Sequence, residues 1–134
     1  MPRPRRIVQN TELDEAIKNA AWMQIQEQGA AALSLRGIAR QLGIAAPSIY
    51  HYYPSRDALV TALIVDAFDS LAQAQRQAFS TAPAGDYPAQ LAAIGSAYRQ
   101  WATRLPQRYQ LIFGTPIPGY VAPEEITLPA AAAG

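Results

Sequence analysis

Residues 34–59 have the sequence SLRGIARQLGIAAPSIYHYYPSRDAL, and this stretch decides the fold. Apolar side chains recur at i, i+3, i+4 and i+7 over Leu35–Leu42, which is the spacing of one face of an α-helix. Ser34 can cap the start of this helix, because its hydroxyl can accept a backbone N–H that the helix leaves free. Gly43 ends the helix, since glycine adopts the left-handed conformation of a helix C-terminus at little cost.

A second short helix is predicted over residues 47–53. Pro47 suits the first turn of a helix, where its missing N–H removes no hydrogen bond, and Ile49 and Tyr53 lie four residues apart on one inward face. Two short helices joined by a tight turn form a helix-turn-helix, whose second helix enters the major groove of DNA. The stretch therefore predicts a DNA-reading element.

The outward face of the second helix supplies candidate DNA contacts. Small residues at its start allow a close approach to the groove, and tyrosine hydroxyls can donate hydrogen bonds to phosphates. Arg36 and Arg56 are the cationic candidates, and backbone N–H groups at the helix starts near Ser34 and Ser55 can also bind phosphate. The predicted DNA-binding residues are Ser34, Arg36, Ala45, Ala46, Pro47, Ser48, Tyr50, His51, Tyr52 and Arg56.

The rest of the chain also favours helices, and alanine, its most frequent residue, is the best helix former. We expect an all-α fold with a basic flexible arm at 1–10, a helix-turn-helix domain at 11–56 and a partial helical domain at 57–134. Further helices are predicted at 12–28, 56–80, 88–105 and 107–113. The long helix is expected to link the two domains, whereas prolines after Thr115 argue against a long regular element in the tail.

Two apolar stripes in the second half are predicted to face inward. The stripe of the long helix consists of Leu59, Leu63, Ala67, Leu71 and Ala74. The stripe of the 88–105 helix consists of Leu91, Ile94, Tyr98, Trp101 and Leu105.

The formal net charge of +1 hides an asymmetry. Residues 1–56 contain seven basic and four acidic residues, whereas residues 57–134 contain four basic and six acidic ones. A basic N-terminal part favours contact with nucleic acid. Arg3, Arg5 and Arg6 are equally consistent with an arm in the minor groove and with a solubilising tail.

Several function classes are excluded or disfavoured by composition. The chain has no cysteine and a single histidine, so it has no disulfide, thiolate zinc site, iron–sulfur cluster or cysteine nucleophile. It also lacks the glycine-rich phosphate loop, the nucleophile elbow and the paired-histidine zinc motif. Asp66 and Asp69 are predicted to lie on a solvated helix face rather than to hold a metal ion. We expect no enzyme activity, metal or cofactor.

The segments SLRGIARQLG at 34–43 and PSIYHYYPSRDAL at 47–59 resemble the DNA-binding domain of the TetR family of bacterial transcriptional regulators. The resemblance covers about residues 11–75, with two notable departures from the family pattern and one conservative replacement that keeps the charge. Tyr52 stands where the family usually has histidine, Tyr53 where it has phenylalanine, and Arg56 where it has lysine. The additional hydroxyl of Tyr53 needs a hydrogen-bond partner.

The resemblance implies a regulatory domain after the helix-turn-helix, one that binds a small effector and forms a homodimer. It implies a cytoplasmic bacterial protein, held at the nucleoid through DNA, that acts as a ligand-responsive repressor on a palindromic double-stranded DNA operator. The family's regulatory domain is usually longer than residues 57–134, so a partial domain is expected here. The candidate pocket residues, for which plain core packing is an equal alternative, are Tyr98, Trp101, Leu111 and Phe113.

A second function class stays open. The chain is also compatible with a non-enzymatic helical protein-interaction module that binds no specific DNA and uses the Leu59–Ala74 stripe as its dimer seam. The two classes differ in salt dependence, because binding to duplex DNA releases counterions and weakens steeply as salt rises.

Overall fold

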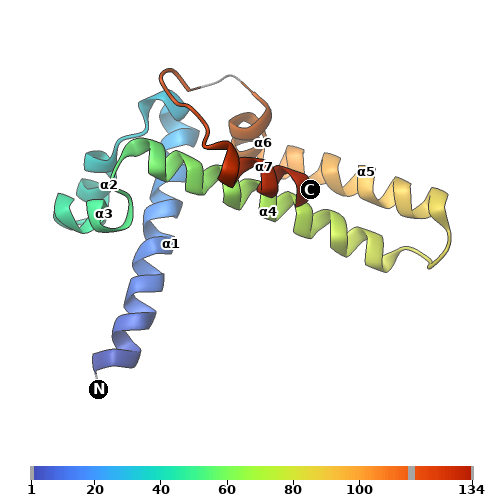
Figure 1. Ribbon diagram of the computed structural model, residues 1–134, viewed down its shortest axis with the longest axis horizontal. Coiled ribbons are helices and arrows are strands. Elements are labelled where there is room, and N and C mark those ends of the chain that lie inside the picture. Colours follow the sequence, from blue (N-terminus) through green and yellow to red (C-terminus); the bar gives the residue numbers. More distant parts are fainter. Residues whose placement is uncertain (1, 115–116, 134) are drawn as a thin grey trace. The chain divides into compact units, whose positions relative to one another are not determined.

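A computed structural model describes residues 2–114 and 117–133, and within these ranges the secondary structure is helical without strands (Figure 1). The elements are α1 Pro2–Gln28, the 3-10 helix η1 Ala30–Ala32, α2 Leu35–Leu42, α3 Ala46–Tyr52, α4 Arg56–Thr81, α5 Tyr87–Arg104, α6 Pro106–Phe113 and α7 Glu124–Ala133. The predicted all-α fold is confirmed. Among the described residues, no helix is both long enough and apolar enough to cross a membrane.

The chain divides into two compact units. The first contains α1, η1, α2, α3, the start of α4 as far as Val60, and the short segment Ile117–Gly119. The second contains α4 from Thr61 onward, α5, α6 and the described residues from Tyr120, which include α7. Because α4 is one continuous helix, it contributes residues to both units.

In the first unit, α1 packs on α2, and α2 packs on α3. The predicted inward residues Leu35, Ile38, Ala39, Ile49 and Tyr53 are buried, together with Ile17 of α1. The local signals also hold: the Ser34 hydroxyl caps α2, and Gly43 has the left-handed conformation that ends it, with φ of 68°.

The hydroxyl of Tyr53 has the partner that its position requires. It donates a short hydrogen bond to the Asp14 carboxylate on α1, which also forms an ion pair with Lys18 at 3.9 Å. The departure from phenylalanine at this position therefore adds a polar tie between α1 and the end of α3.

The structure corrects the prediction of a flexible arm at 1–10, because residues 2–10 form the first turns of α1. Pro2 and Pro4 are compatible with this, since backbone N–H groups in the first turn of a helix have no intrahelical acceptor anyway. The side chains of Arg3, Arg5 and Arg6 lie outside the residues whose side chains are described.

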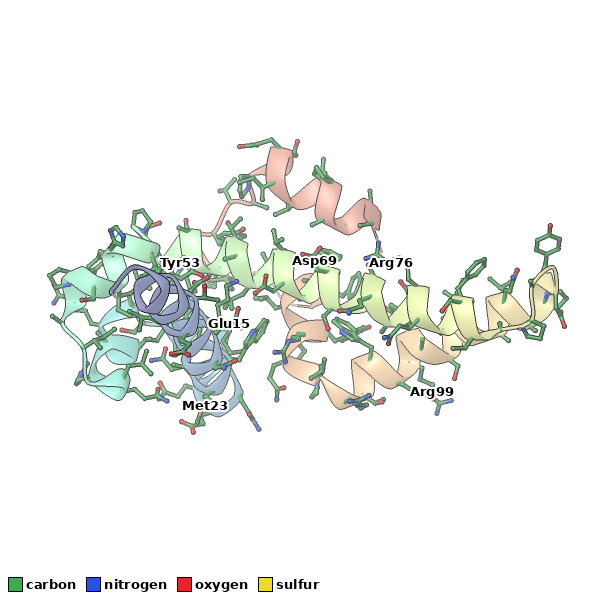
Figure 2. All side chains as sticks on the ribbon, turned by 90° about the horizontal axis from the view of Figure 1, so that it is seen from below. Glu15, Met23, Tyr53, Asp69, Arg76 and Arg99 are labelled. Carbon is green, nitrogen blue, oxygen red and sulfur yellow. The ribbon has the colours of Figure 1, made fainter. Side chains whose placement is uncertain are left out.

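The second unit is built on α4 and α5, which run antiparallel beside each other (Figures 1 and 2). The inward face of α5 agrees with the predicted stripe at Trp101, which is buried, and differs from it at Leu91, which is 72% exposed, and at Gln90, which is buried although it was not in the stripe. The indole Nε1 of Trp101 donates to Ser70 Oγ on α4 at 3.0 Å. This bond fixes the rotation of α5 and leaves part of its apolar stripe outside.

The structure also corrects the prediction of a dimer seam on α4. Leu59, Leu63, Ala67 and Leu71 are buried, so the Leu59–Ala74 stripe is not available as a dimer seam.

The prediction that prolines prevent a long regular element in the tail is corrected as well. The tail contains a ten-residue helix, α7, although Pro129 lies inside it. Glutamates at its start favour the helix N-terminus, and the alanines after Pro129 have the highest helix propensity. Ahead of α7, the hydroxyls of Tyr120 and Thr61 lie 2.8 Å apart and form a hydrogen bond.

Candidate nucleic-acid interface

A hollow of about 400 Å³ in the first unit brings the start of α2, the side of α3 and the start of α4 together. Four predicted DNA contacts from these elements meet at it, namely Ser34, Arg36, Tyr50 and Arg56. The complete lining is Leu33, Ser34, Leu35, Arg36, Tyr50, Ser55 and Arg56. Residues up to 23 positions apart thus form one site with two guanidinium groups, two serine hydroxyls and a phenol.

Two helix N-termini add to the positive character of this hollow. The Ser34 hydroxyl accepts the Gly37 N–H at 3.1 Å at the start of α2, and the Ser55 hydroxyl accepts the Ala58 N–H at 3.1 Å at the start of α4. The earlier N–H groups of each helix have no intrahelical acceptor, and they carry the positive end of the helix dipole. Such an arrangement suits a phosphate.

Arg56 is held in place by backbone carbonyl groups. Its Nη1 donates to the Ala31 carbonyl at 3.4 Å and its Nη2 to the Pro118 carbonyl at 3.2 Å. A guanidinium has five N–H donors, so these two bonds leave others for an anion. The Arg36 side chain, by contrast, is exposed.

The surface of α3 is small and mostly apolar. Ala45, Pro47, Tyr50 and His51 are exposed, whereas Ala46, Ser48 and Tyr52 are half-buried. The rings of His51 and Tyr52 meet edge to face, with centroids 5.5 Å apart. Methyl and proline carbons can contact a thymine methyl, but they do not distinguish hydrogen-bond donors from acceptors on a base.

Sequence reasoning missed one residue beside this site, Gln24 of α1. Its Oε1 accepts the Ser34 N–H at 3.0 Å, and its Nε2 donates to the Ser34 carbonyl at 3.4 Å. The signal that could have found it is Gly37, which occupies the third helical position of α2, where a capping box has glutamate or glutamine.

The four predicted pocket residues of the second unit have different surroundings. The rings of Tyr98 and Phe113 join those of Tyr109 and Phe68 in an aromatic cluster with centroid distances of 5.4–6.4 Å. Leu111 is half-buried.

Trp101 lines a separate hollow of about 680 Å³ between α4 and α5. The other polar groups that line this hollow come from Ser70, Gln73, Gln77, Ser80, Thr81, Gln100 and Arg104. The hollow is therefore more polar than the predicted aromatic pocket.

Two titratable groups in the second unit have shifted pKa values. Burial raises the pKa of Tyr98, and the neighbouring Tyr109 acts in the same direction. Burial lowers the pKa of the Arg108 guanidinium, and the charge of Asp66 opposes that shift. The Asp66 carboxylate thus interacts with the Arg108 guanidinium of the same unit. Among the described residues there is no group of three or more side chains suited to a metal ion.

Comparison with known families gives one match in each half of the chain. Residues 17–63 match the family described as bacterial regulatory proteins, tetR family. Residues 91–134 match the family described as tetracyclin repressor-like, C-terminal domain. Both descriptions are of regulatory proteins, in agreement with the prediction of a non-enzymatic protein.

Curated relatives agree with these matches. The chain is 40% identical over 116 residues to the HTH-type transcriptional regulator Rv1816 of Mycobacterium tuberculosis and to Mb1846 of Mycobacterium bovis. The aligned region covers 87% of this chain and 50% of each relative, so the chain spans about half the length of the curated relatives that it matches.

Solved structures share the fold. SCO4313, which is named as a regulatory protein, has a crystal structure that matches 99% of this chain and 61% of its own, with a TM-score of 0.84 and 45% identity. A protein of unknown function from Rhodococcus sp. RHA1 matches 89% of this chain and 60% of its own, with a TM-score of 0.75 and 26% identity.

Proposed function

The chain belongs to the TetR family of bacterial regulatory proteins, and we propose that it binds double-stranded DNA sequence-specifically as a transcriptional regulator. The observation that carries this proposal is the hollow at which Ser34, Arg36, Tyr50 and Arg56 meet beside the starts of α2 and α4. In this proposal, a phosphate of the DNA backbone binds there and sets the register of α3 in the major groove.

The exposed residues of α3 then contact base edges and methyl groups. Ala45, Pro47 and His51 face solvent, and Ser48 is half-buried next to them. This surface has few side chains with paired donors and acceptors, so base contacts alone discriminate weakly. Part of the specificity is then expected from sequence-dependent DNA shape, which proteins read through the backbone.

The finer proposal is a ligand-responsive repressor that acts as a homodimer on a palindromic operator. Helix α4 supports a coupling of this kind, because the same helix supplies Arg56 to the candidate phosphate site and Ser70 to the second unit. An effector would shift the protein toward a state whose two reading helices no longer fit both half-sites. Of the predicted pocket residues, Trp101 lines a hollow of ligand size.

Selection of bound duplexes from a random library tests the DNA-binding proposal directly. Enrichment of a single motif is the expected result, and the affinity for the enriched duplex should fall steeply with salt because of counterion release. Recovery of no motif, or an affinity that is insensitive to salt, would contradict the proposal. The variant Arg36→Ala tests the hollow itself. It removes the exposed guanidinium there and should lower both the affinity for the duplex and its salt dependence.

A second candidate function is a non-enzymatic helical interaction module. The exposure of Tyr87 and Leu91, at 78% and 72%, favours it, since both are large apolar side chains on one face of α5. Such a module would associate with protein partners with little change between low and high salt. The selection experiment separates the two functions, because the module would enrich no duplex.

A further inference from the structure

Ser34 lies between two hollows in the first unit. On one side is the candidate phosphate site with Arg36 and Tyr50, and on the other is a hollow of about 380 Å³ that contains the Gln24 side chain of α1. The Gln24 side chain therefore reaches the N-terminus of α2 from the side opposite the candidate phosphate site.

Gln24 holds both backbone polar groups of Ser34. Its amide oxygen accepts the Ser34 N–H at 3.0 Å, and its amide nitrogen donates to the Ser34 carbonyl at 3.4 Å. The Ser34 hydroxyl in turn accepts the Gly37 N–H at 3.1 Å. In an ordinary capping box, the residue at the third helical position bonds back to the N–H of the capping residue. Here that bond comes from another helix, ten residues earlier in the chain.

Gly37 is what makes room for Gln24. A Cβ atom at Gly37 would lie 2.8 Å from Gln24 Nε2, closer than real Cβ contacts. Gly37, the third residue of α2, has no side chain that could complete a capping box. The Gln24 amide lies in that place and forms the hydrogen bond to the Ser34 N–H instead. The paired hydrogen bonds and the short approach to Gly37 thus describe one placement of the Gln24 amide, which a side chain at position 37 would displace.

We propose that Gln24 is a positioning residue for DNA binding, which fixes the α2 N-terminus so that its free N–H groups and Arg36 meet a backbone phosphate. The inference rests on the proposed function. Gln24 itself lines the opposite hollow, and both of its hydrogen bonds go to the backbone of Ser34. Its effect on DNA therefore passes through the backbone of the N-cap.

The test compares three variants of the full chain on the duplex enriched by selection. Gln24→Met removes both hydrogen bonds at similar size, and Gly37→Ala displaces the Gln24 amide while raising the helix propensity of α2. Gln28→Met is the matched control, because Gln28 lines the same hollow one turn later without a bond to Ser34. Affinity is measured over a salt series, and hydrogen exchange of the Ser34 amide is measured without DNA.

For Gln24→Met and Gly37→Ala we expect duplex affinity on the order of tenfold weaker, a salt slope smaller by about one, and faster exchange at Ser34. Gln28→Met should match the wild type in all three measurements. The Gly37→Ala result is decisive, since an effect through helix stability alone would leave affinity unchanged or improve it. Affinity that falls with an unchanged salt slope, or an unchanged affinity, overturns the proposal.

Failure of the proposed function gives a different result. If the wild-type chain binds no duplex, the role of Gln24 in DNA binding is also overturned. The exchange rates at Ser34 in Gln24→Met and Gln28→Met then still decide whether the hydrogen bonds to Gln24 exist in solution.

Discussion

In the first unit Ile38 of α2 is completely buried, whereas in the second unit Leu91 of α5 is 72% exposed, although both belong to apolar stripes at helical spacing. Helix α2 lies between α1 and α3, so its apolar face is covered on both sides. Helix α5 buries Trp101 of its stripe and the polar Gln90, but it leaves Leu91 exposed. An apolar stripe therefore marks a face that benefits from cover, and only the neighbouring elements determine whether the chain itself supplies that cover.

Each unit contains one tryptophan, which allows the two regions to be followed separately. Trp22 of the first unit and Trp101 of the second are both buried. Fluorescence of single-tryptophan variants during unfolding by denaturant can therefore report on each unit. Four substitutions, two in each unit, are expected to change the free energy of unfolding to different degrees.

The largest effect is expected for Ile38→Ala. This substitution removes a completely buried side chain and should lower the free energy of unfolding by about 3 kcal/mol, through lost burial and the cavity left behind. The measurement is the denaturation midpoint followed at Trp22. A loss below about 1 kcal/mol would show that the interior of the first unit relaxes around the gap.

Tyr53→Phe is expected to have the next largest effect. It removes the hydroxyl that donates to the Asp14 carboxylate, and a hydrogen bond to a charged group contributes about 2 kcal/mol. The double variant with Asp14→Ala, which removes the acceptor, measures the coupling between the two side chains. Additive effects would mean that the hydrogen bond does not contribute to the stability of the first unit.

Trp101→Phe tests the corresponding tie in the second unit. The loss of the indole bond to Ser70 should cost about 1 kcal/mol beyond the effect of the smaller ring. Ser70→Ala provides the partner variant for a double-mutant cycle, and Trp101 fluorescence in that variant reports the change of environment. If Ser70→Ala leaves the emission and the midpoint unchanged, this bond does not set the rotation of α5.

The smallest effect is expected for Leu91→Ala, which changes an exposed side chain and should alter the free energy of unfolding by less than about 0.5 kcal/mol. A loss of several kcal/mol that grows with protein concentration would show that another chain covers this face of α5. In that case the apolar stripes of both units would be covered, and the function as an interaction module that uses this face of α5 would be favoured.

The first unit could be predicted closely because its signals are local. Ser34 and Gly43 mark the two ends of α2, Pro47 falls in the first turn of α3, and the stripe from Leu35 to Leu42 needs only one partner face. Ser34, Arg36, Tyr50 and Arg56 could be proposed as DNA contacts for the same reason, since each lies near a helix end or on the face opposite the core, and the structure brings them to one hollow.

The second unit and the bonds between distant residues could not be predicted in the same way. A spacing of three and four residues leaves the rotation of α5 open by the width of its stripe, and the hydrogen bond from Trp101 to Ser70 selects a face that contains Gln90. Helix α7 contains Pro129, which removes a backbone hydrogen bond, yet Thr127 and Ala130 of this helix are buried, and such burial is a tertiary contribution that the local sequence does not show.

By itself, the sequence determined the helical fold, the helix-turn-helix and the family resemblance, because caps, turns and periodicity act over a few residues. The tertiary structure alone decided which groups meet: Gln24 with Ser34, Tyr53 with Asp14, and Arg56 with the carbonyls of Ala31 and Pro118. These contacts join residues 10 to 62 positions apart. No local pattern specifies such pairs, since their geometry exists only once the helices have packed.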